Sequence, residues 1–137
     1  MVNFEELKGK IILKIEGLYS GSEEIIIWTS DGMRYSMFHD QNCCEHVSVE
    51  DIDGCAEDFV GYEVLMAEES SNSDDSDDPN NEYESCTWTF YRLGSIKGYM
   101  TIRWLGVSNG YYSESVSVYA NPDPEVVRVL KIEKGLE

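Results

Sequence analysis

The chain has 137 residues, a length that fits one domain built around one hydrophobic core. Hydrophobic residues make up 42% of the sequence, which excludes a wholly disordered protein. The 10 Lys and Arg residues against 27 Asp and Glu give a net charge of −17, which excludes general affinity for nucleic acid or anionic membranes. An anionic ligand held in one locally basic pocket stays compatible with this charge.

Runs of β-branched and aromatic residues predict most of the secondary structure as strands. Seven segments have this character: Lys10–Gly17, Glu24–Thr29, Met33–His39, Tyr62–Ala67, Thr87–Arg92, Tyr99–Val107 and Tyr112–Tyr119. The pair Asp31-Gly32 predicts a tight hairpin between the second and third of them. With one short helix over Gly54–Val60, the pattern predicts an all-β or β-rich α+β fold, in which residues 1–137 form a single domain with an antiparallel sheet of about seven strands.

Asn109-Gly110 is a preferred pair for a two-residue hairpin turn and predicts pairing of the strands on either side. In that register Arg103 lies diagonally from Glu114, so we expect a half-buried ion pair on a mainly apolar face. The opposite face carries Trp104 above small hydroxyl side chains. That composition is typical of a shallow binding site or of a surface packed against another sheet.

The middle of the chain is strongly acidic, with no Lys or Arg between Tyr35 and Tyr91. No apolar residue occurs from Ser70 to Glu82, and this segment predicts a mobile acidic loop over residues 70–85. In the tail over Pro124–Gly135, the β-branched residues favour a strand over a helix.

The segment His39–His46 holds two His and two Cys residues, which are metal-ligating types, but their spacing matches no common zinc pattern. A structural role is therefore favoured over a metal site. Nearby acids raise the pKa of a thiol and argue against a Cys nucleophile. With 27 acidic residues, carboxylate pairs carry no information about acid–base catalysis. The sequence predicts a protein that is not an enzyme and has no cofactor.

One set of aromatic and polar residues on two neighbouring segments is the candidate ligand site. Trp and Tyr offer stacking planes, Arg offers a bidentate anion contact, and Asn and Ser offer hydrogen bonds. The alternative is that these aromatic pairs only stabilise the sheet. The set comprises Trp88, Arg103, Trp104, Asn109, Tyr111, Tyr112 and Ser113.

The motifs Trp-Thr-Phe-Tyr at 88–91 and Ser-Asn-Gly-Tyr-Tyr-Ser at 108–113 resemble a family of small uncharacterised acidic proteins. Members of that family come from bacteriophages and from bacteria that carry prophages, and the resemblance covers roughly Gly9 to Tyr119. It implies a non-enzymatic phage counter-defence protein that sequesters a small nucleotide-like signalling ligand. The alternative is an acidic mimic of nucleic acid that inhibits a host defence protein through its basic surface.

The N-terminal residues 1–14 lack the pattern of a secretory leader, and no apolar run is long enough to cross a membrane. We therefore expect a protein of the cytoplasm, of the host cell if the chain is phage-encoded. Its four cysteines are expected to be free thiols in that compartment. We expect no direct nucleic-acid or membrane partner, and the oligomeric state is left open.

Overall fold

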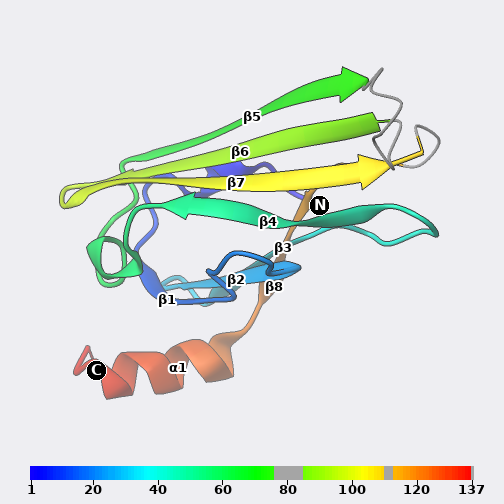
Figure 1. Cartoon of the computed structure of the whole chain (residues 1–137). Coiled ribbons are helices and arrows are strands. Elements are labelled where there is room, and N and C mark those ends of the chain that lie inside the picture. The colour runs from blue at the N-terminus through cyan, green and yellow to red at the C-terminus, as the bar shows by residue number, and fades with distance from the viewer. Residues whose placement is uncertain (76–84, 110–112, 137) are drawn as a thin grey trace.

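Two four-stranded antiparallel sheets stack face to face in the computed structural model, which describes residues 1–75, 85–109 and 113–136 (Figure 1). One sheet has the strand order β1-β2-β3-β8, and the other has the order β4-β7-β6-β5. The strands are β1 (Ile12–Glu16), β2 (Glu24–Thr29), β3 (Met33–Phe38), β4 (His46–Asp53), β5 (Met66–Asp75), β6 (Ser85–Ser95), β7 (Gly98–Ser108) and β8 (Ser117–Pro122). The β-rich prediction is confirmed, with eight strands in place of seven.

The core lies between the two sheets and is filled by alternate residues of each strand. On β7 the inward residues Ile102 and Trp104 are buried, and on β6 Tyr91 and Leu93 are buried in the same way. The facing sheet contributes Ile25, Ile27, Tyr35 and Met37. Because side chains alternate between the faces of a strand, the residues between these point away from the core. Trp104 thus belongs to a surface packed against another sheet, the second of the two roles that its sequence context predicted.

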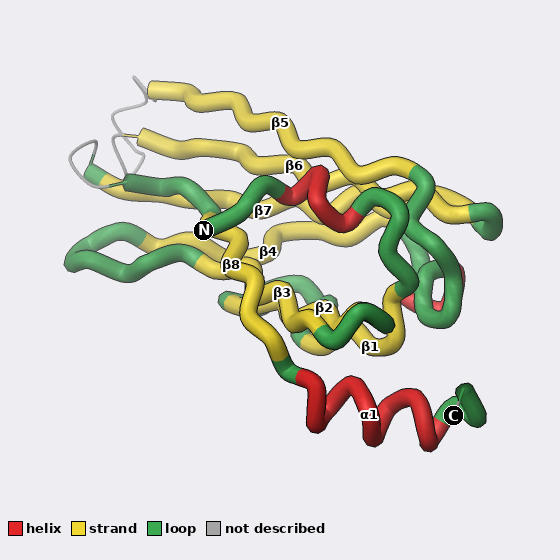
Figure 2. Tube along the Cα trace, turned by 180° about the vertical axis from the view of Figure 1, so that it is seen from behind, coloured by secondary structure: helices red, strands yellow, loops and turns green. Residues whose placement is uncertain are grey.

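Short helical segments close the ends of the sandwich. The 3-10 helix η1 (Phe4–Leu7) places Phe4 and Leu7 in the core, and Phe4 contacts the ring of Tyr91 at 4.7 Å between centroids. Figure 2 shows this segment alongside the β4-β7-β6-β5 sheet. The helix expected over Gly54–Val60 is reduced to the 3-10 turn η2 (Ala56–Asp58). No helix in the described ranges is both long and apolar enough to span a bilayer.

The C-terminal segment forms the helix α1 (Pro124–Glu133), so the strand favoured for this tail is wrong. Pro124 occupies the first turn, where its missing N–H leaves no hydrogen bond unmade. Val127 and Leu130 are three residues apart and pack on Leu13 and Trp28, on the outer face of the β1-β2-β3-β8 sheet. Burial of this helical stripe outweighs the β-propensity of the valines. Figure 1 shows α1 lying beneath that sheet.

The hairpin predicted at Asp31-Gly32 is confirmed, since β2 and β3 pair with Trp28 opposite Arg34. The hairpin predicted at Asn109-Gly110 is wrong. Both edges of β7 are occupied, by β6 and by β4, while β8 pairs with β3 in the other sheet. A Cβ atom on Gly106 would lie 2.5 Å from the carbonyl oxygen of Glu114, so the returning chain packs against β7 without forming a ladder.

Strand β4 (His46–Asp53) is not among the seven predicted strands. Its signal is the alternation of Val47 and Val49, both buried, with exposed or half-buried polar residues. The acidic loop predicted over residues 70–85 is also partly wrong. Residues 70–75 continue β5 and residue 85 begins β6, while the stretch between them lies outside the described residues.

Candidate functional site

The outer face of the β4-β7-β6-β5 sheet carries aromatic and arginine side chains at its centre. The β6–β7 register places Trp88 opposite Leu105, Phe90 opposite Arg103 and Arg92 opposite Thr101. These six side chains are half-buried, whereas their neighbours along each strand, apart from Thr87, are buried. We call Trp88, Phe90, Arg92 and Arg103 the aromatic–arginine face.

Each arginine of this face lies over an aromatic ring. The guanidinium carbon of Arg103 is 5.5 Å from the centroid of Trp88, and that of Arg92 is 5.3 Å from the centroid of Phe90. Both distances are within the range of a cation–π contact. The face therefore presents two cations and two planar rings in an alternating arrangement.

Hydrogen bonds from neighbouring strands fix both guanidinium groups. Arg103 Nη2 donates to Glu50 Oε1 at 3.0 Å, and Arg92 Nη1 donates to Ser70 Oγ at 3.1 Å. The Arg103 side chain is 38% exposed, so part of its donor set stays open to solvent. An arginine that is already oriented loses less conformational entropy when it binds a carboxylate or phosphate.

The structure brings together two of the seven predicted ligand residues, Trp88 and Arg103. Trp104 lies in the core with no exposed surface, on the opposite face of β7. Asn109 and Ser113 are exposed near the end of the sandwich, and Ser113 Oγ is 2.8 Å from Ser115 Oγ. Tyr111 and Tyr112 lie outside the described residues. The Ile102, Trp104, Gly106 and Ser108 side of β7 faces the second sheet, which is one of the two roles expected for it. The Arg103 side forms the outer face of the β4-β7-β6-β5 sheet.

Phe90 and Arg92 were missed, although the alternation Trp88-Phe90-Arg92 along one strand was the signal that could have found them. The ion pair predicted between Arg103 and Glu114 is also wrong, since Arg103 pairs with Glu50. Glu114 is buried and accepts hydrogen bonds from the hydroxyls of Thr87 at 2.7 Å, Ser85 at 3.2 Å and Ser108. These donors all come from the ends of β6 and β7, so Glu114 anchors the returning chain.

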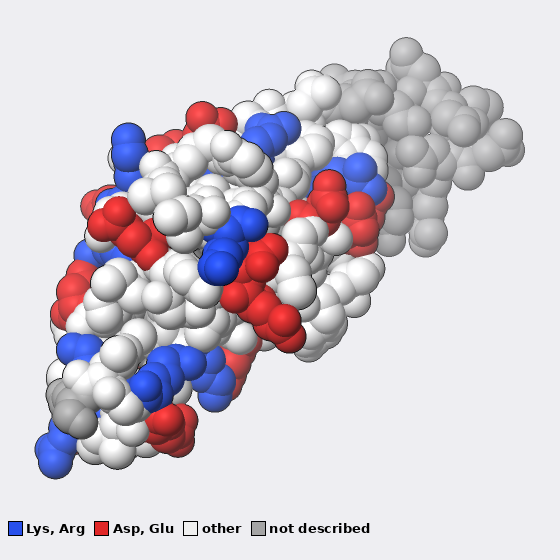
Figure 3. Space-filling view, turned by 90° about the vertical axis from the view of Figure 1, so that its left-hand side faces the viewer, with Lys and Arg blue, Asp and Glu red and all other residues white. Residues whose placement is uncertain are grey.

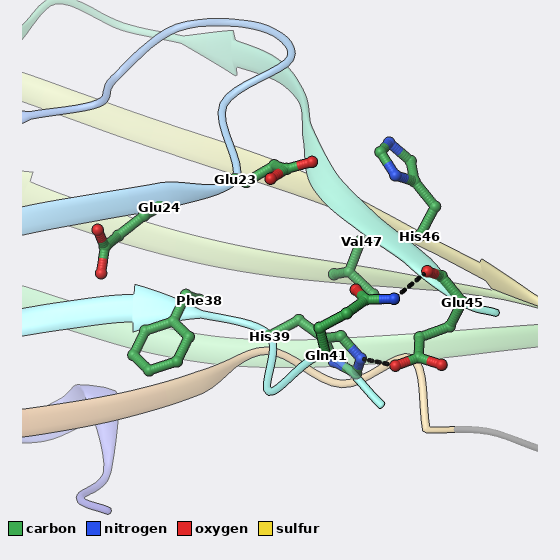
Figure 4. A pocket seen from close by; sticks show the side chains of 8 residues that line it. All are labelled: Glu23, Glu24, Phe38, His39, Gln41, Glu45, His46 and Val47. Atoms are coloured by element: carbon green, nitrogen blue, oxygen red, sulfur yellow. Dashed lines mark hydrogen bonds and ion pairs between the residues drawn. The ribbon is translucent and has the colours of Figure 1, made fainter. Parts of the chain in front are cut away.

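A separate pocket of about 570 Å³ opens where β3 leads into β4. Figure 4 shows its lining, which comes from the starts of β2 and β4, the end of β3 and the connection between β3 and β4. We call it the β3–β4 pocket. Its lining residues are Glu23, Glu24, Phe38, His39, Gln41, Glu45, His46 and Val47.

Glu45 organises the inner wall of the β3–β4 pocket. Its buried carboxylate accepts hydrogen bonds from His39 Nε2 at 3.0 Å and from the backbone N–H groups of Asn42 and of Cys43, the latter at 3.2 Å. His39 Nδ1 is 2.7 Å from the carbonyl oxygen of Ser115. Both ring nitrogens thus face oxygen atoms, which fixes the orientation of the ring.

Electrostatics at Glu45 favour its charged form. Burial raises the pKa of its carboxyl. Hydrogen bonds from the N–H of Asn42, the ring of His39 and the N–H of Cys43 lower the pKa by more than burial raises it, so that it falls to about 2. The carboxylate therefore stays ionised at any physiological pH. Its lone pairs are committed to the connection between β3 and β4, so it shapes the pocket and leaves other groups to meet a ligand.

The Cys and His residues of this connection form no group of three potential metal ligands within the described ranges. Cys43 and Cys44 are joined by a disulfide, where free thiols were expected. Figure 4 shows the His46 ring turned away from Glu45, whereas His39 is directed at it.

Residues 5–118 match the family model described as "Domain of unknown function (DUF7448)". Neither a curated protein nor a solved structure matches the chain. The matched residues include all strands of the β4-β7-β6-β5 sheet, with the aromatic–arginine face, and all residues of the β3–β4 pocket. The matched stretch is most of the chain, and the protein belongs to this family of domains of unknown function.

Proposed function

We propose that this protein is a non-enzymatic binding protein that sequesters a small nucleotide-like ligand on its aromatic–arginine face. The observation that carries the proposal is the pair of arginine–aromatic contacts, Arg103 over Trp88 and Arg92 over Phe90. Aromatic rings stack on planar bases, and guanidinium groups bind phosphates through paired hydrogen bonds.

Charge limits the size of the ligand. The net charge of −17 repels a polyanion over a long range, whereas a small anion senses mainly the arginines close to it. Figure 3 views the end of the sandwich at the turn between β6 and β7 and shows basic and acidic side chains interspersed, without one broad basic patch. This distribution favours a small ligand with few charges over a length of nucleic acid.

The biological role that we propose is counter-defence by a phage-encoded protein in the host cytoplasm. The sequence resemblance to phage and prophage proteins motivates this role, and the binding of a nucleotide-derived signal would be its mechanism. Sequestration requires affinity and abundance and no chemical step, which fits a face whose side chains supply stacking planes and anion contacts.

Tryptophan fluorescence provides a direct test. Trp28 and Trp104 are buried, and Trp88 is half-buried beside Arg103, so a stacked ligand should quench Trp88 selectively. Titration with mono- and dinucleotides should give saturable quenching that is lost in Trp88→Phe. Arg103→Ala and Arg92→Ala should each weaken binding by about tenfold or more, since a charge-assisted contact contributes roughly 1.5–3 kcal/mol.

Arg128→Ala is the matched control, because Arg128 is exposed on α1 and its removal changes the net charge equally. Its affinity should equal that of the unmodified protein. Absence of saturable quenching with every nucleotide, together with no ligand released from the native protein on denaturation, would reject the proposal.

The second candidate is the acidic inhibitor that covers a basic surface of a host protein. Strand β5 favours it, because β5 is an edge strand whose residues Glu68 to Ser73 are exposed and polar. Deleting residues 70–82 would remove half of a paired strand, so neutralising changes are the better test. Glu68→Gln with Glu69→Gln should abolish inhibition if the surface charge acts, and should leave it intact if the aromatic–arginine face acts.

A further inference from the structure

The β3–β4 pocket is distinct from the aromatic–arginine face and has the opposite charge. The exposed residues Glu23 and Glu24 line it from the start of β2, and Glu45 lines it from the chain before β4. Figure 4 shows the Glu23 and Glu24 side chains pointing in different directions. None of its eight lining residues is Lys or Arg. Figure 1 places the connection between β3 and β4 at the right-hand end of the sandwich, away from the end drawn in Figure 3.

The carboxylates of Glu23 and Glu24 have no hydrogen-bond or ion-pair partner among the described residues. Other carboxylates of the molecule do have cationic partners: Asp31 binds Lys10, Glu16 binds Lys14, and Asp123 lies near Arg34. The residues that line the pocket with Glu23 and Glu24 include no Lys or Arg that could act as such a partner. The two glutamates therefore leave uncompensated charge beside a cavity.

An aromatic ring completes the wall next to these carboxylates. Phe38 is the direct cross-strand partner of Glu24, and Figure 4 shows the ring and the carboxylate side by side. Phe38 also stacks on Tyr119 at 5.2 Å between centroids, and Tyr119 donates a hydrogen bond to Asp40 at 2.6 Å. The ring is thus held in place, with one side supported.

The remaining wall is fixed before any ligand arrives. Glu45 is hydrogen-bonded to His39 and to two backbone N–H groups, and Gln41 Nε2 donates to the carbonyl oxygen of Glu45 at 2.7 Å. A preformed site loses little entropy on binding. Its volume of about 570 Å³ lies within the range of small-molecule sites.

We propose that the β3–β4 pocket binds an organic cation of the alkylammonium or guanidinium class. Glu23 and Glu24 supply ion pairs to the cationic groups, and Phe38 supplies the face for a cation–π contact. This site is independent of the proposed nucleotide site. It lies at one end of the sandwich, whereas the nucleotide site lies on the outer face of the β4-β7-β6-β5 sheet, and its ligand has the opposite charge.

The test is a calorimetric titration with spermidine at about 150 mM salt, where charges more than roughly 8 Å apart are screened. Saturable binding is expected in the unmodified protein. The double variant Glu23→Gln, Glu24→Gln should lose at least about tenfold in affinity, and Phe38→Leu should lose about threefold through the missing ring. Glu23 and Glu24 are exposed and Phe38 is half-buried, and thermal melts establish that each variant folds.

Non-specific attraction to a protein of charge −17 is controlled by a variant of equal charge. Glu57→Gln with Glu63→Gln removes two exposed carboxylates from the chain between β4 and β5. This control should bind spermidine as the unmodified protein does. Equal weakening in both double variants, or an absence of saturable binding, would overturn the proposal.

A parallel titration with N-acetyl-arginine methylamide distinguishes the two sources of such a cation. Preference for spermidine supports a free polyamine, whereas preference for the arginine derivative supports a side chain of another protein. Arg103→Ala leaves the pocket intact and should not change either titration. A failure of this site and a failure of the nucleotide site are therefore observed separately.

Discussion

Arg103 illustrates the scale at which single contacts act in this molecule. Its pair with Glu50 is half-buried, with side-chain exposures of 38% and 33%, and such solvent-accessible pairs contribute about 0–1 kcal/mol. The contact with Trp88 contributes a further ~0.5–1 kcal/mol. Arg103→Ala should therefore lower the free energy of unfolding by about 0.5–2 kcal/mol in urea titrations. A loss above about 3 kcal/mol would mean that the Arg103–Glu50 pair behaves as an ion pair fully shielded from water.

Glu45 predicts a pH dependence at the same scale. Its pKa in the folded protein, about 2, is below the ordinary value of 4.5, so its contribution to stability is complete above pH 4.5 and is lost as the pH falls toward 2. The melting temperature should fall over this interval. In Glu45→Gln the melting temperature should be lower at pH 7, and its difference from the unmodified protein should shrink on acidification. A constant difference down to pH 2 would contradict the role assigned to this carboxylate.

Helix α1 is stabilised by its packing on the sheet, which single-residue changes on its two faces can demonstrate. Leu130 is 7% exposed against Leu13 and Trp28, and Leu130→Ala should cost about 2–3 kcal/mol. Val129, one position earlier, is 53% exposed, and Val129→Ala should change stability by less than about 0.5 kcal/mol. Urea titrations of both variants decide the matter. Equal effects would mean that α1 is not docked in solution.

The elements also differ in how far local sequence determines them. The hairpin at Asp31-Gly32 follows from local sequence, because Asp-Gly favours a tight turn and the strands on either side of it pair directly with each other. The composition of β5 does not predict a strand beyond Ala67, because the residues from Ser70 onward are polar. They form a strand because β5 pairs with β6 along its whole length, from Met66 to Asp75. A partner strand supplies backbone hydrogen bonds to any sequence, so the acidic segment becomes a strand without burying apolar surface.

The whole molecule carries an excess of negative charge that ten cations cannot compensate. Mutual repulsion destabilises the compact state more than the expanded one, and salt screens it. The melting temperature should therefore rise by a few degrees between about 20 mM and 300 mM NaCl. KCl should act in the same way, because screening depends on ionic strength alone. A melting temperature that is independent of salt would mean that the charges are compensated within the structure.

The sequence by itself determined the β-rich class, the hairpin at Asp31-Gly32 and the presence of aromatic and arginine residues near one another. These follow from composition and from interactions between residues close in the chain. Only the tertiary structure decided that β7 lies between β4 and β6 and that β8 joins the other sheet. Those pairings determine which face of β7 is buried, and so place Arg103 on an open face beside Trp88 and Trp104 in the core. The alternation of a strand is visible in its sequence, but the face that meets the second sheet depends on strands that are distant in the chain.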